Sequence, residues 1–113
     1  MRNNSLHPEV YALSVTLTLD HNYRALLTDF LAKVADRLEE RGYPLVGHIK
    51  LAAQNAAGGV FYASIVDKTT GPQCQGGLNE LQRPATLKIN AILYQVEKGV
   101  IQEIIDAELK SLR

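Results

Sequence analysis

The sequence predicts an α+β fold, a two-layer sandwich in which two helices cover one face of a mainly antiparallel four-stranded sheet. Four stretches of the chain alternate apolar and polar residues, as half-buried strands do. Two other stretches repeat apolar residues at intervals of three and four, as helices with one buried side do. The predicted order is β-α-β-β-β-α, with no internal repeat and no second domain.

The first predicted strand runs from Val10 to Leu19. Its leucines and Val15 occupy alternate positions and share one face, whereas Ser14 and Thr16 fall on the other. Residues 1–8, in front of this strand, are expected to be a flexible tail, and residues 9–113 a single domain.

A helix is predicted next. Asp20 or Asn22 can cap its start, and Gly42 ends it where a left-handed residue is favourable. Its apolar stripe consists of Leu26, Leu27, Phe30, Leu31, Val34, Ala35 and Leu38. Because this helix joins the first strand to the second, the two strands can lie parallel through a right-handed crossover.

The remaining elements are predicted from the same patterns. Residues 43–54 form the second strand, residues 55–59 a glycine-containing turn and residues 60–67 the third strand. Residues 68–84 are rich in turn-forming residues and are expected to be a long irregular loop. Residues 85–96 alternate again, and residues 98–112 carry the apolar stripe of a last helix.

Composition narrows the function classes. The chain has 113 residues, and its twelve basic residues balance its twelve acidic ones, so no overall positive field attracts nucleic acid. Cys74 is the only cysteine, which excludes an intrachain disulfide and a multi-cysteine metal site. No signal peptide and no apolar run of roughly 20 residues is present. We therefore expect a cytoplasmic protein with neither a nucleic-acid nor a membrane partner.

The candidate site lies on the strand face that the helices leave free. This face collects Ser14, Thr16, Thr18, His48, Lys50, Lys88 and Asn90, with Ser64 or Tyr62 depending on phase. Three interpretations stay open: a solvated face, as antiparallel sheets often have, a dimer interface in which two faces or two strand edges pair, or a binding site. In the third, His48 and Lys50 act as donors to a ligand or partner.

The sequence gives little support for a catalytic site or a metal site. His48 has no reacting group or orienting partner that the sequence can place. No two histidines have the i, i+4 spacing of a helical metal site, and no phosphate-binding loop is present. Cys74 is interpreted as an incidental thiol. We therefore assign no catalytic residue, no metal ligand and no cofactor.

One part of the chain resembles a known family. The run Pro44-Leu45-Val46-Gly47-His48-Ile49-Lys50, followed by a glycine hairpin and the strands at residues 60–66 and 85–94, resembles a small region C-terminal to some CobW-type GTPases linked to cobalamin and metal handling. Their phosphate loop and cysteine-rich metal motif are missing here. The resemblance implies a stand-alone accessory domain that acts with a GTPase or a corrinoid or metal-handling protein, without enzymatic activity of its own.

The leading hypothesis is a non-enzymatic accessory or protein-interaction domain, acting as a homo-oligomer or with a protein partner. His48, Lys50, Lys88 and Asn90 form its recognition surface. The alternative is a small-molecule or enzyme site built from His48 and Lys50, with residues 68–84 as a lid. A third hypothesis is a metal or corrinoid held by His48.

Overall fold

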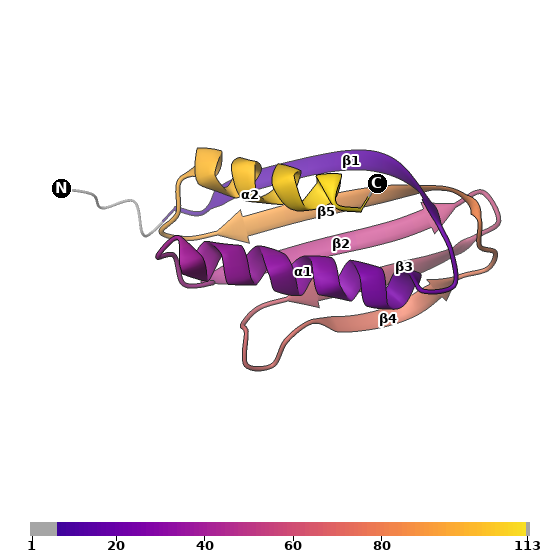
Figure 1. Cartoon of the computed structure of the whole chain (residues 1–113), viewed down its shortest axis with the longest axis horizontal. Helices are drawn as coiled ribbons and strands as arrows, with labels where there is room; N and C mark the ends of the chain where they lie inside the picture. Colours follow the sequence, from indigo (N-terminus) through magenta and orange to yellow (C-terminus); the bar gives the residue numbers. More distant parts are fainter. Residues whose placement is uncertain (1–6, 113) are drawn as a thin grey trace.

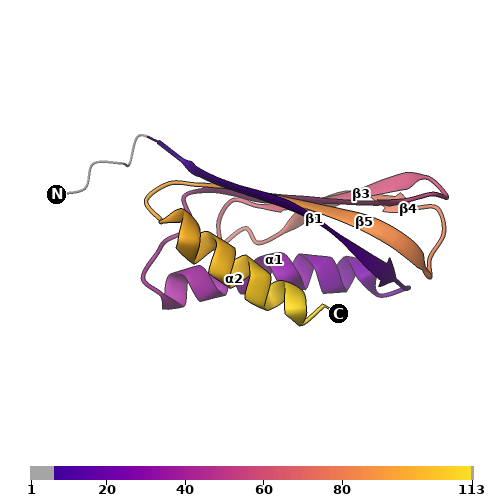
Figure 2. The same cartoon turned by 90° about the horizontal axis from the view of Figure 1, so that it is seen from above.

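The computed structural model of the chain describes residues 7–112. Within this range the chain forms one five-stranded sheet with two helices on one of its faces (Figures 1 and 2). The elements are β1 (Glu9–Leu19), α1 (Tyr23–Glu40), β2 (Gly47–Asn55), β3 (Gly59–Ile65), β4 (Gln73–Leu78), β5 (Arg83–Leu93) and α2 (Lys98–Lys110). The predicted α+β class is confirmed, with five strands in place of the four expected. Residues 1–6 of the predicted tail lie outside the described residues.

The strands lie in the order β1-β5-β2-β3-β4, and each neighbouring pair is antiparallel. Because β1 and β2 both run opposite to β5, they point in the same direction, as the crossover through α1 predicts. They are not neighbours, however, since β5 is inserted between them. The last strand in the sequence, β5, is therefore an inner strand next to the edge strand β1, and β2 is the central strand.

The core lies between the sheet and the helices. Odd-numbered side chains in the middle of β2, β3 and β5 face the helices, and Ile49, Phe61 and Leu87 among them are fully buried. Leu27 and Ile105 meet them from α1 and α2. Each such side chain contributes about 1.5–3 kcal/mol by leaving water, which is why the two apolar helical stripes turn towards this face.

The end of α1 follows the predicted capping. Gly42 has a φ of +88°, and its N–H donates to the carbonyl of Glu39 over 2.9 Å. The N–H of Tyr43 donates to the carbonyl of Leu38 over 2.9 Å. The chain then reaches β2, which begins at Gly47 and not at Tyr43 as expected. Within residues 7–112 neither helix is long and apolar enough to cross a membrane.

Strand β4 corrects the expectation that residues 68–84 are irregular throughout. Gln73–Leu78 pairs with β3 along its whole length. Two contacts from α1 hold the strand in place. The N–H of Leu78 donates to the Tyr23 hydroxyl over 3.2 Å, and the Arg24 guanidinium donates to the carbonyl of Gly76 over 2.7 Å.

Candidate functional site

The helices leave one face of the sheet uncovered, as Figure 2 shows. This outer face comprises the even-numbered side chains of β1, β2, β3 and β5, together with Gln73 and Gln75 of β4. All of the predicted site residues lie on it. Tyr62 and Ser64, between which the sequence left the choice open, both belong to it.

The strand register brings three of the four predicted site residues together. Lys50 of β2 lies directly opposite Asn90 of β5 and, on its other side, opposite Ser64 of β3. Lys88 lies one row further along β5, opposite Ala52. Lys50 and Lys88 are therefore diagonal neighbours on adjacent strands, a relationship that puts Cα atoms about 7–8 Å apart.

His48 lies apart from this group. It faces Ile92 at the beginning of β2, one row beyond Lys50 and away from Lys88, and it is half-buried. It borders neither of the two larger hollows of the outer face, nor a smaller one at Ala52, Gln54, Thr86 and Lys88. Within residues 7–112 no group of three or more His, Cys, Asp and Glu side chains could hold a metal ion, so His48 belongs to no such cluster.

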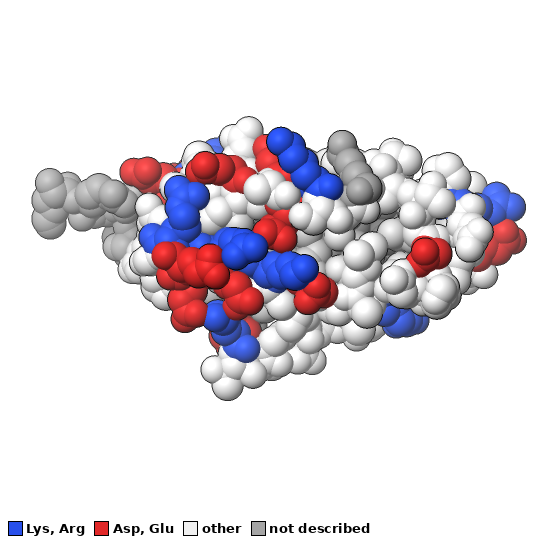
Figure 3. Space-filling view, in the orientation of Figure 1, with Lys and Arg blue, Asp and Glu red and all other residues white. Residues whose placement is uncertain are grey.

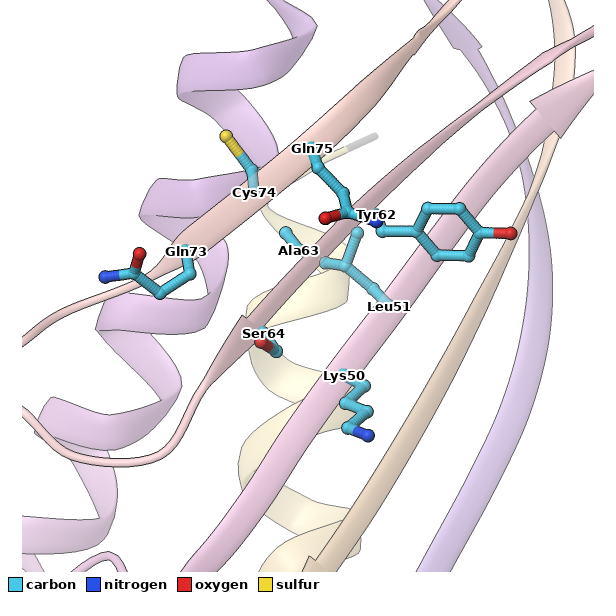
Figure 4. A pocket seen from close by; sticks show the side chains of 8 residues that line it. All are labelled: Lys50, Leu51, Tyr62, Ala63, Ser64, Gln73, Cys74 and Gln75. Carbon is cyan, nitrogen blue, oxygen red and sulfur yellow. The ribbon is translucent and has the colours of Figure 1, made fainter.

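A central hollow of about 540 Å³ opens on the outer face above β1, β5 and β2. Small side chains, among them Ala12 and Ala52, make its floor. Four larger ones surround it: Lys50, Tyr62, Lys88 and Asn90. Ala52 lies directly opposite Tyr62, and its small side chain leaves room for the ring to lie across β2 (Figure 4).

A second hollow of about 380 Å³ adjoins the first on the side of β4. Figure 4 shows its polar lining. These residues are Lys50, Tyr62, Ser64, Gln73, Cys74 and Gln75. Lys50 and Tyr62 border both hollows, so the two lie next to each other and together form a depression across the sheet that these side chains divide. The part of residues 68–84 that borders it is an edge strand of the sheet, which corrects the expectation of a lid.

Charge is distributed unequally between the two sides of the molecule. On the helix side, basic and acidic side chains are mixed (Figure 3) and form ion pairs such as Lys33–Asp29 at 3.2 Å and Arg41–Glu103 at 3.1 Å. Lys68 pairs with Glu39 and Asp36, and its hydrogen bonds to these two carboxylates raise its pKa. These charges are balanced locally.

The outer face has no such balance. Among the described residues it holds Lys50 and Lys88 and not one Asp or Glu. Neither lysine has an ion-pair partner within residues 7–112. Asn90, Ser64 and the Tyr62 hydroxyl add neutral hydrogen-bond donors beside the two ammonium groups. This set of donors can bind carboxylate or other anionic oxygens.

Sequence reasoning left one part of this site undecided, the choice between Ser64 and Tyr62, and missed another. Tyr62 is the aromatic wall between the two hollows, and its alternation with Ser64 in residues 60–65 could have placed both on the outer face. Gln73 and Gln75 belong to a strand that carries no apolar alternation, so no signal of that kind was available.

No protein-family model and no curated protein matches the chain. Two solved structures that resemble it are the Zn(II)-bound YjiA GTPase from E. coli, with 12% identity and a TM-score of 0.42, and a Zn(II)-bound triple mutant of YjiA GTPase, with 14% identity and a TM-score of 0.43. Each match covers 92% of this chain and 30% of that chain. The match therefore extends over about 30% of the length of these two structures.

Proposed function

We propose that this chain is a non-enzymatic interaction domain whose outer face binds an acidic segment of a partner protein. Lys50 and Lys88 supply the charge, Asn90 supplies a neutral donor, and His48 lies at the margin of the contact. The observation that carries the proposal is the pair of neighbouring lysines, without ion-pair partners among the described residues, on a face that holds no carboxylate there.

Charge complementarity supports an acidic partner. Two like charges that lie close on neighbouring strands repel each other, so the charges of the lysine pair give the sheet no stability. A carboxylate placed between two ammonium groups forms charge-assisted hydrogen bonds, which are about twice as strong as neutral ones. The floor of small side chains lets an extended segment approach the sheet closely.

The arrangement gives less support to catalysis. A general base must lie within hydrogen-bond reach of the group it activates. His48 borders neither hollow, and no histidine or carboxylate lies among the residues that line either one. The resemblance of residues 44–96 suggests which partner to try first, a GTPase or a corrinoid or metal-handling protein.

The test is a titration of the ¹⁵N-labelled chain with a glutamate-rich peptide, with the glutamine version of the same peptide as control. The glutamate peptide is expected to shift the amide signals of Lys50, Lys88 and Asn90, and the shifts should weaken as salt is added. The double variant Lys50→Glu/Lys88→Glu should abolish them. A matched variant, Lys98→Glu/Lys110→Glu on α2, changes net charge equally and should retain them. Equal loss in both variants would refute recognition by the outer face.

A second candidate is a small-molecule carboxylate bound in the central hollow. It is favoured by the hollow's volume of about 540 Å³, which lies in the range of small-molecule sites. Screening carboxylate fragments by the same amide signals separates the two proposals. Saturable shifts confined to residues of β1, β5 and β2 would support the small ligand, whereas peptide binding is expected to extend to β4.

A further inference from the structure

Strand β1 is an edge strand that is open along its whole length. Glu9–Leu19 pairs with β5 on one side, from Glu9 opposite Leu93 to Leu19 opposite Arg83. On its other side no strand of the described residues lies beside it (Figure 1). Such an edge exposes backbone N–H and C=O groups that can pair with another strand.

The features that usually protect an edge strand from pairing with another chain are absent from β1. Between Val10 and Leu19 the strand has no charged residue, no proline and no glycine. The opposite edge, β4, also lacks charge and proline, but it is shorter and contains glycine. It is six residues long, Gly76 within it has a φ of +81°, and the Arg24 guanidinium occupies the Gly76 carbonyl. Pairing would thus be interrupted at Gly76 on the β4 edge, whereas β1 has no such interruption.

Apolar side chains also remain partly exposed along β1. Tyr11, Leu13 and Val15 face the helix layer but are only half-buried, unlike the side chains of the central strands. On the outer face, Val10 is 46% exposed. A strand added to this edge would cover apolar surface on both sides of the sheet.

We propose that β1 pairs with β1 of a second copy of this chain, antiparallel and about a two-fold axis perpendicular to the sheet. A two-fold contact brings a strand against itself, so any charge in its middle would meet its own copy. Val10–Leu19 carries no charge, and no register of the pair therefore opposes like charges within it. The strand is suited to its own copy because it is neutral from Val10 to Leu19.

This pairing makes one continuous ten-stranded sheet from the two five-stranded ones. A perpendicular two-fold axis keeps both helix layers on one side and both outer faces on the other. Ala12 and Ser14 of β1 line the central hollow, so the two hollows of the dimer lie next to each other across the axis. The inference rests on β1 alone and does not depend on what the outer face binds.

A matched pair of substitutions tests the proposal. Thr16 of β1 and Thr86 of β5 lie directly opposite each other on the outer face, and both are exposed. Light scattering and sedimentation are expected to show a dimer of the unmodified chain. Thr16→Lys places a charge in the pairing edge and should raise the dimer dissociation constant at least about tenfold, whereas Thr86→Lys should change it less than about twofold.

Cysteine scanning tests where along β1 the two-fold axis lies. In a Cys74→Ser background, single cysteines at Ala12, Ser14 and Thr16 can form a disulfide with their own copy only near the axis, where Cα atoms come within about 4.4–6.8 Å. Crosslinking under mild oxidation should therefore peak at one position and fall away on either side. A monomer at about 0.5 mM, a dimer unaffected by Thr16→Lys, or equal crosslinking of Thr86→Cys would overturn the proposal.

Discussion

Tyr11 donates its hydroxyl hydrogen to Asp106 Oδ1 over 2.7 Å, and this bond ties the edge strand β1 to α2. Burial, and then the hydrogen bond and the negative charge of Asp106, raise the pKa of Tyr11 to about 12. The bond matters for the proposed dimer because it holds β1 in the fold independently of any second copy.

Tyr11→Phe removes this hydrogen bond and is expected to lower the free energy of unfolding by about 1 kcal/mol at pH 8. The pKa of Tyr11 is about 12 in the folded chain and 10.0 ordinarily, so the stabilisation is fully present below pH 10 and is lost as the pH rises towards 12. Urea unfolding at pH 8 and at pH 11 should show the difference between the two proteins shrinking. A difference that stays constant with pH would contradict a neutral, hydrogen-bonded Tyr11.

Gly47 starts β2 with a φ of +122°, a conformation that favours glycine. A Cβ atom at this position would lie 2.1 Å from the carbonyl oxygen of Ile92 in the neighbouring strand. Gly47→Ala is therefore expected to lower the free energy of unfolding by more than about 2 kcal/mol, through backbone strain and displacement of β5. Chemical unfolding measures the loss.

Gly99 is the matched control. It lies in the first turn of α2, where an added Cβ atom would come within 4 Å of no other described part of the chain beyond its own helical turn. Gly99→Ala should raise the free energy of unfolding by about 0.5–1 kcal/mol, because alanine favours the helix. If both glycine substitutions proved neutral, the left-handed start of β2 would be wrong.

The sequence patterns predicted the strands and helices correctly where the spacing of apolar residues matches the side that is buried in the structure. Alternation in residues 10–19 and 85–93 predicted which side of each strand is buried, and the helical stripe predicted the face of α1. Strand β4 was not predicted because contacts distant in sequence hold it in the sheet. Gln73–Leu78 pairs with β3 and is bonded to Tyr23 and Arg24 of α1. Tertiary contacts, and not local propensity, make it a strand.

The candidate site, too, was predicted only in the part that depends on local sequence patterns. Period-two alternation was enough to place Lys50, Lys88 and Asn90 on one face. Their grouping depends on β5 lying next to β2, and alternation carries no information on strand order. For the same reason the pairing of His48 and Lys50 in sequence was misleading: side chains two residues apart share a face, but the central hollow takes its residues from different strands and leaves His48 out.

The attachment of β4 can be tested through Tyr23. Its ring packs edge-on against Phe61 at 5.2 Å, and its hydroxyl accepts the Leu78 N–H. Tyr23→Phe keeps the ring contact and leaves that N–H without its partner, at a cost of about 1 kcal/mol. Hydrogen exchange should become faster at residues 73–78 than elsewhere. Tyr94→Phe is the control and should leave exchange in β4 unchanged, and equal effects of the two would argue against the Tyr23 tether.

Loss of peptide binding in a lysine variant is informative only if the variant still folds, and the two lysines should meet this condition. Lys50→Glu replaces a like-charged diagonal pair with an opposite-charged one, so the free energy of unfolding should stay the same or rise by a few tenths of a kcal/mol. Lys33→Glu, by contrast, sets a carboxylate against Asp29, whose ion pair with Lys33 spans 3.2 Å, and should lower the melting temperature. Both shifts should shrink in about 1 M salt, where the screening length is about 3 Å. A Lys50→Glu variant that melts well below the unmodified chain would show that Lys50 stabilises the sheet itself. The lysine pair would then no longer support the proposal that the outer face is a binding surface.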